Sequence, residues 1–145
     1  MPRYDHDRLV RLVSHMRNSV AQLERLKANK KQAFLSDTDK VGSSKYHFIV
    51  AIEAAIDICN HIIFQNGYRA PEDYADTFSV LEEKGALDKA FAESLQEMAK
   101  FGNRLVHIYW EIDESQVHDI LQSRLGDFKK FLDQIAVFLG WSGIN

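Results

Sequence analysis

The sequence predicts an all-α fold: one domain, residues 1–145, built as an up-and-down bundle of four main helices and one short helix. Apolar residues recur at steps of three and four along most of the chain, and no segment shows the alternation of a strand. Two prolines and seven glycines are too few for a chain dominated by turns. A hydrophobic content of 46% is enough for one buried core at this length.

The first half of the chain contains two predicted long helices. The first runs from about residue 5 to 34, on the stripe Leu9, Val13, Met16, Val20 and Leu23. Polar residues 36–38 interrupt the pattern. The second helix follows on the stripe Ile49, Ile52, Ile56, Cys59 and Ile63. Asn66 and Gly67 predict its C-terminal end.

The second half contains the short helix and two further long ones. Pro71 opens the stretch of the short helix, in which Tyr74, Phe78 and Leu81 can share a face, and Lys84 and Gly85 close it. The fourth helix has the most regular stripe in the chain: Phe91, Leu95, Met98, Gly102, Leu105, Tyr109 and Ile112. A fifth helix follows Asp113 with one apolar face: Leu121, Leu125, Phe128, Leu132, Ile135 and Leu139. Short connections between such helices favour antiparallel packing.

Composition and charge restrict the functional classes. The single Cys59 excludes an internal disulfide and a multi-cysteine zinc site, so a reducing cytoplasm is expected. No leader opens the chain and no apolar run approaches the roughly eighteen residues of a membrane span, so no membrane partner is expected. A net charge of -3 gives no general attraction to phosphate. Any nucleic-acid binding must therefore use a local patch or a groove between two subunits.

Residues 98–110 place an amide, a guanidinium, an imidazole and a phenol within two helical turns. The stretch Asn-Arg-Leu-Val-His-Ile-Tyr resembles the signature of the HEPN ribonucleases, in particular the HepT-like toxins of HEPN/MNT toxin–antitoxin pairs. That family has Arg, a polar residue, three further positions and then His-x-Tyr. Asn103, His107 and Tyr109 match this pattern, whereas Gly102 stands at the arginine position. Residues 55–63, Ala-Ile-Asp-Ile-Cys-Asn-His-Ile-Ile, also resemble the family.

The resemblance implies a homodimeric toxin that cleaves RNA, such as tRNA or mRNA, and not DNA, without a metal or another cofactor. Its partner would be an MNT nucleotidyltransferase antitoxin, which uses ATP and magnesium to transfer AMP to Tyr109. Gly102 implies an impaired or inactive form, either a natural variant or a replacement made so that a toxic enzyme could be produced. The alternative is a catalytically silent HEPN module that dimerises and docks its partner.

The motif residues suit metal-free RNA cleavage. The reaction needs a base for the 2'-OH proton, an acid for the leaving 5'-oxygen and a cation for the phosphoryl oxygens. His107 can serve either proton role, because the unperturbed pKa of histidine is about 6.5. Asn103 lies one turn earlier on the same face and could orient the imidazole or a phosphate oxygen. An arginine would supply the cation, because its fork matches phosphate oxygens.

Several residues near the motif have competing interpretations. Arg104 projects about 200° from position 102 and cannot simply replace the missing arginine. A glycine inside a helix costs roughly 1 kcal/mol relative to alanine, which suggests close packing at Gly102. Tyr109 projects about 160° from His107 on an ideal helix, so the helix must end or bend between them if both serve one site.

A second polar pair, Asp57 and His61, is spaced i,i+4 on the second predicted helix. It could ligate a metal, but no third ligand is evident, so hydrogen bonding between helices is favoured. Trp110 could form a subunit contact or stack on a base, with packing favoured. Arg104, Asp57 and His61 are thus supporting candidates beside the motif residues.

Overall fold

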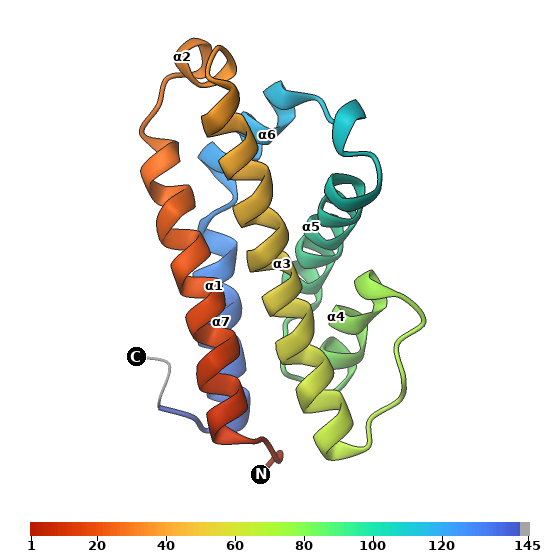
Figure 1. Cartoon of the computed structure of the whole chain (residues 1–145). Coiled ribbons are helices and arrows are strands. Elements are labelled where there is room, and N and C mark those ends of the chain that lie inside the picture. Colours follow the sequence, from red (N-terminus) through yellow and green to blue (C-terminus); the bar gives the residue numbers. More distant parts are fainter. Residues whose placement is uncertain (143–145) are drawn as a thin grey trace.

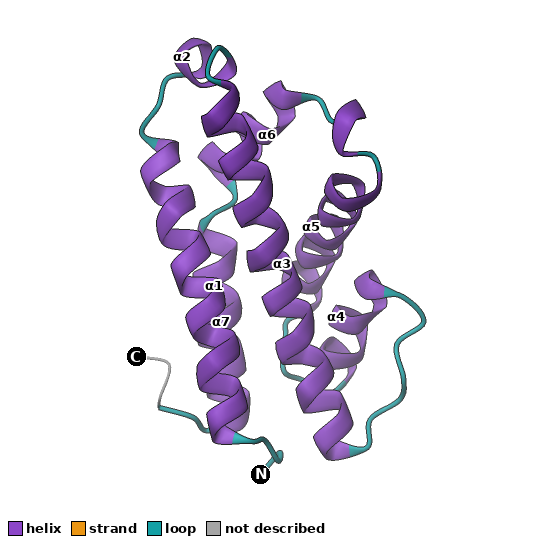
Figure 2. Ribbon diagram, viewed as in Figure 1, coloured by secondary structure: helices purple, strands orange, loops and turns teal. Residues whose placement is uncertain are grey.

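The computed structural model describes residues 1–142, and in that range it contains seven α-helices, one 3₁₀ turn and no strand (Figures 1 and 2). The elements follow in the order α1 His6–Lys27, α2 Lys31–Leu35, α3 Thr38–Asn66, α4 Tyr74–Glu83, α5 Lys89–His107, η1 Tyr109–Glu111, α6 Glu114–Ser123 and α7 Gly126–Leu139. The predicted all-α helical bundle is confirmed.

Aspartate side chains cap the N-termini of most of these helices. Each of the following accepts a hydrogen bond from a backbone N–H in the first turn of its helix: Asp5, Asp37, Asp73, Asp88 and Asp113. Such caps satisfy N–H groups that have no partner within the helix. Gly67 ends α3 in the left-handed conformation, with φ of 64°. The stop predicted at Asn66 and Gly67 is confirmed, because glycine adopts this conformation without a Cβ penalty.

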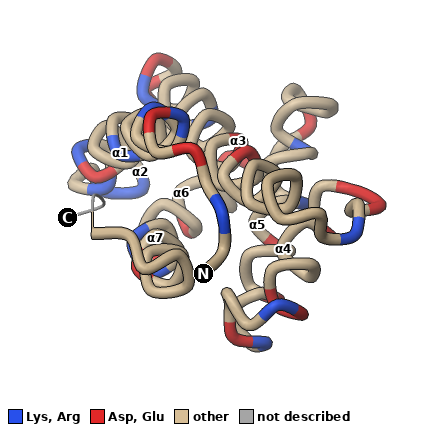
Figure 3. Tube along the Cα trace, turned by 90° about the horizontal axis from the view of Figure 1, so that it is seen from below, with Lys and Arg blue, Asp and Glu red and all other residues tan. Residues whose placement is uncertain are grey.

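Helix α3 is the centre of the bundle. It packs against α1, α2, α4, α5, α6 and α7, and Figure 1 shows it between α1 and the α4–α5 pair. By length and composition alone it could cross a membrane, contrary to the sequence expectation that no segment is apolar enough. Most of its apolar stretch is buried inside the fold, as in the core helix of a bundle. Charges of both signs lie around the outside (Figure 3).

The first helix is shorter than predicted. The prediction of one helix to about residue 34 is wrong, because α1 stops at Lys27 and α2 starts at Lys31. The Asn29 side chain donates to the Leu26 carbonyl at 3.0 Å and accepts from Lys40 Nζ at 2.7 Å. These bonds replace the next helical turn and attach the break to the start of α3.

The last predicted helix is divided into α6 and α7. The break falls at Arg124, whose guanidinium donates to the Ser94 carbonyl of α5 at 2.9 Å and to Asp127 of α7 at 2.8 Å. Glu97 of α5 lies 3.6 Å from the same guanidinium. A corner attached to α5 therefore replaces a straight helix, and the apolar stripe continues across it, with Leu121, Leu125 and Phe128 all buried.

Candidate functional site

The motif lies where α5 ends. His107 is the last helical residue, and Ile108 leaves the helix with φ of -132° and ψ of 41°. The N–H of Glu111 then donates to the Ile108 carbonyl at 2.8 Å and closes the turn η1. The predicted fourth helix is therefore correct up to His107, but Tyr109 and Ile112 at the end of its stripe lie beyond it. The helix does end between His107 and Tyr109, as one site using both would require.

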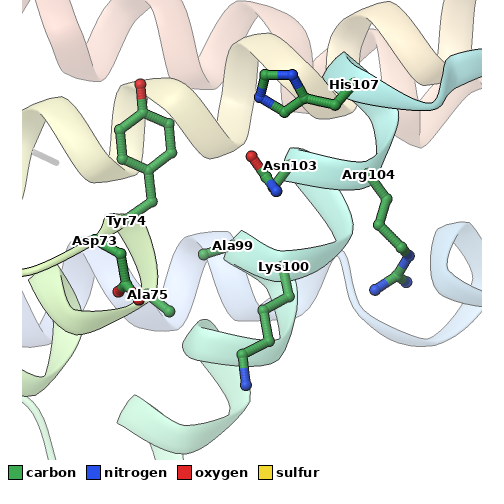
Figure 4. A pocket seen from close by; sticks show the side chains of 8 residues that line it. All are labelled: Asp73, Tyr74, Ala75, Ala99, Lys100, Asn103, Arg104 and His107. Atoms are coloured by element: carbon green, nitrogen blue, oxygen red, sulfur yellow. The ribbon is translucent and has the colours of Figure 1, made fainter.

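A groove of about 490 Å³ runs between the start of α4 and the second half of α5 (Figure 4). It is lined by Asp73, Tyr74, Ala75, Ala99, Lys100, Asn103, Arg104 and His107. Asn103 and His107 are both exposed and lie one helical turn apart on the side of α5 that faces Tyr74, whereas Arg104 is directed away from them (Figure 4). The structure therefore places the predicted amide and imidazole together and leaves the Arg104 guanidinium at the edge.

Gly102 is not part of this groove. A Cβ atom at Gly102 would lie 3.0 Å from Cγ2 and 3.1 Å from Cδ1 of Ile52, a buried residue of α3. Close packing thus explains the glycine, as the sequence indicated. An arginine at position 102 would start in the seam between α3 and α5, and Ile52 would have to move to admit it.

Tyr109 lies against α3 and does not line the groove. Lys45 Nζ lies 4.2 Å from the centre of the Tyr109 ring and donates to the Tyr109 carbonyl at 3.4 Å. The same Nζ contacts a Glu114 carboxylate oxygen at 3.3 Å. Tyr109 is 40% exposed. Its hydroxyl packs close to Gly42 of α3, 3.7 Å from the position that a Cβ atom on this glycine would occupy. The phenol is therefore held by α3 and still reaches the surface.

Lys45 was not predicted from the sequence. Its side chain is only 5% exposed, and it supports η1 through the contacts with Tyr109 and Glu114. Lys45 lies seven residues, or about two helical turns, before Ile52. It therefore continues the buried stripe of α3 toward the start of the helix. A lysine in the register of an apolar stripe is the signal that could have identified it.

Asp57 and His61 do not line the groove. His61 Nε2 accepts a hydrogen bond from the Asp5 backbone N–H at 2.8 Å, which supports the interpretation as hydrogen bonding between elements. Burial lowers the pKa of His61, and the charge of Asp5 partly opposes this shift. Burial raises the pKa of Asp57, and the charge of Arg8 partly opposes that rise. Within residues 1–142, no group of three His, Cys, Asp or Glu side chains could hold a metal ion.

The sequence predicted a helical bundle in which Asn103 and His107 share one face of a helix, and the structure has this arrangement (Figure 4). The family model described as Ribonuclease HepT-like matches residues 16–135. The chain belongs to the HepT-like ribonuclease family, and the predicted resemblance is confirmed.

Known proteins agree with this assignment. The chain is 34% identical over 83 residues to the mRNA nuclease HepT of Shewanella oneidensis, a match that covers 57% of this chain and 62% of that protein. It is similar in structure to a tri-AMPylated Shewanella oneidensis HEPN toxin in complex with MNT antitoxin, with a TM-score of 0.82, 24% identity and coverage of 89% of this chain and 96% of the other.

A second structural relative is YutE of Bacillus subtilis, a cytosolic protein of unknown function. Its TM-score is 0.81 at 16% identity, with coverage of 96% of this chain and 93% of YutE. At identities this low, structural similarity shows the fold alone. The two TM-scores confirm the helical arrangement of this fold.

Proposed function

We propose that this chain is the cytoplasmic toxin of a HEPN/MNT toxin–antitoxin pair and a metal-independent endoribonuclease whose activity is impaired by Gly102. The observation that carries the proposal is the exposed pair of Asn103 and His107 in an open groove of a HepT-like protein. The similarity to an mRNA nuclease makes mRNA the favoured substrate class.

The proposed reaction uses His107 as its proton carrier. The 2'-oxygen of the RNA loses its proton, attacks the adjacent phosphorus and displaces the 5'-oxygen, which takes up a proton. One imidazole can take the first proton, and a second can deliver the other. Two chains paired about a two-fold axis would supply both imidazoles and would concentrate their cations at one groove. The proposal therefore includes a homodimer, and sedimentation showing a monomer at micromolar concentration would contradict that part.

Gly102 provides the direct test of catalysis. Since Ile52 stands in the way of a side chain at position 102, the arginine should be restored together with Ile52→Ala. We expect the Gly102→Arg/Ile52→Ala variant to gain RNase activity that survives EDTA, and the added change His107→Ala to abolish the gain. Gly102→Met/Ile52→Ala is the matched control, because it fills the same space without a guanidinium. Equal activity with and without His107 would remove this histidine from the mechanism.

Regulation by AMP transfer is the second part of the proposal. A structural relative is described as AMPylated and in complex with MNT antitoxin, and the Tyr109 side chain is partly exposed. In the proposed step the phenol oxygen attacks the α-phosphorus of ATP and pyrophosphate leaves. The bound AMP adds a bulky anion close to the RNA-binding surface, which opposes substrate by size and charge.

The acceptor can be identified by intact mass. Incubation with the partner nucleotidyltransferase, ATP and magnesium should add whole AMP units to the chain, and Tyr109→Phe should prevent the addition. Persistent modification of the Tyr109→Phe variant would place the acceptor elsewhere.

A catalytically silent HEPN module that dimerises and docks its partner is the second candidate. The close packing of Gly102 against Ile52 favours it, because a side chain at position 102 would require Ile52 to shift. Growth arrest distinguishes the two functions. A silent module stays harmless in the Gly102→Arg/Ile52→Ala form, whereas an impaired toxin becomes growth-inhibitory.

A further inference from the structure

We propose that Tyr74 is the base-stacking residue of the α4–α5 groove and makes it selective for an unpaired nucleotide of RNA. The inference rests on the proposed ribonuclease function and adds a substrate feature to it. Tyr74 is the first residue of α4, is 51% exposed and lines the groove opposite Asn103 and His107 (Figure 4). Unpaired bases commonly stack on exposed aromatic rings of this kind.

The start of α4 is held by hydrogen bonds and ion pairs that do not involve the Tyr74 ring. Asp73 accepts from the Asp76 N–H at 2.7 Å and caps the helix. Arg69, in the connection before α4, binds both Asp76 and Glu83, with Nη1 of Arg69 2.7 Å from Asp76. The backbone under Tyr74 is therefore held while its ring stays at the surface. A ring presented in this way loses little conformational freedom when a base stacks on it.

The opposite wall suits the rest of a nucleotide. Lys100 of α5 lines the groove and provides positive charge for phosphate. Asp73 also lines the groove, and its carboxylate accepts a hydrogen bond from the backbone N–H of Asp76. Tyr74 and His107 lie on opposite sides of the groove (Figure 4), so a base on the Tyr74 ring is expected to bring its ribose toward the residue proposed to act on the 2'-OH. Bases inside a duplex have both faces stacked, so only an unpaired nucleotide can use the ring.

Binding tests this inference without needing catalysis by the Gly102 form. The full chain is titrated into a short single-stranded RNA that contains 2-aminopurine, and anisotropy reports affinity while quenching of the base reports stacking. We expect Tyr74→Ala to weaken affinity about tenfold and to remove the quenching. Tyr74→Phe should retain both, whereas Tyr74→Leu should lose the quenching. Phe64→Ala is the matched control, because Phe64 is an aromatic residue that is 84% exposed and does not line the groove.

Each result separates the inference from the function on which it rests. RNA binding that is unchanged in Tyr74→Ala would overturn the stacking role and leave the ribonuclease proposal intact. A Tyr74→Ala variant that loses affinity for the nucleotidyltransferase but not for RNA would also overturn the stacking role. It would show that Tyr74 contacts a protein partner. A duplex bound as tightly as the single strand would also overturn the inference. Absence of RNA binding by the unaltered chain would overturn both proposals.

Discussion

The two sides of α5 near its end differ sharply, although they share the same two helical turns. On the groove side, Asn103 and His107 are exposed to solvent. On the opposite side, Phe101, Gly102 and Leu105 are buried against the core, in large part against α3. The helix thus separates the candidate site residues from the buried residues by face and not by sequence position. Substitutions at neighbouring positions should therefore affect different properties of the protein.

The largest expected difference is between Phe101 and Asn103, two residues apart. Phe101 is 2% exposed, and its ring packs edge-on against the ring of Phe48, with 5.5 Å between the ring centres. We expect Phe101→Ala to lower the free energy of unfolding by about 3–5 kcal/mol, because it leaves a cavity. Asn103→Ala should change it by less than about 0.5 kcal/mol, as usual for a surface substitution. Urea denaturation measures both, and similar losses would show that the two faces are not separate.

A medium effect is expected at Lys45, which connects α3 to η1. Lys45→Met keeps the apolar stem but removes the contacts with Tyr109 and Glu114. We expect a loss of about 1–2 kcal/mol in the free energy of unfolding, because hydrogen bonds to charged groups contribute more than neutral ones. Amide exchange in η1 should become faster.

Lys100→Met on the groove side is the matched control for Lys45. Its amine is exposed, so the stability change should stay within about 0.5 kcal/mol. Unchanged exchange of the η1 amides in Lys45→Met would show that this turn is held by other contacts.

The smallest effect concerns the α4 wall of the groove and depends on pH. Hydrogen bonding to Arg69 lowers the pKa of Asp76 to about 2 and also lowers the pKa of Glu83. Since these folded-state pKa values lie below the unfolded ones, their contribution to stability is complete above the unfolded pKa and is lost as the pH falls through the folded pKa.

Arg69→Ala tests this pH dependence. We expect the unaltered chain to be the more stable of the two above a pH of about 5, and the difference to disappear as the pH falls toward about 2. Thermal unfolding across that range measures it. A stability difference that is independent of pH would assign the role of Arg69 to packing and not to its ion pairs.

The sequence predicts the helices better than their ends. Apolar periodicity identified the core faces, and Gly67 correctly ended α3. The breaks at Asn29 and Arg124 were missed because they depend on side chains that bond to distant helices. A continuous stripe such as Leu121, Leu125 and Phe128 does not report a corner that such bonds create.

The site was predictable only where the motif is local. Asn103 and His107 share a face because they lie one turn apart, and the sequence shows this directly. The position of Tyr74 beside them depends on how α4 packs on α5, and Lys45 reaches Tyr109 across 64 positions of the chain. Such pairings between distant segments are set by tertiary packing and leave no local pattern.

The contact between Ile52 and Gly102 also restricts how this sequence can evolve. Regaining the family arginine by one mutation would first produce a crowded seam, and losing Ile52 first would produce a cavity. Each intermediate should be less stable than the present Ile52–Gly102 pair, so the two positions are expected to change together. Among related chains, the residue opposite position 102 should then indicate whether a lineage retains the arginine or has exchanged it for tight packing.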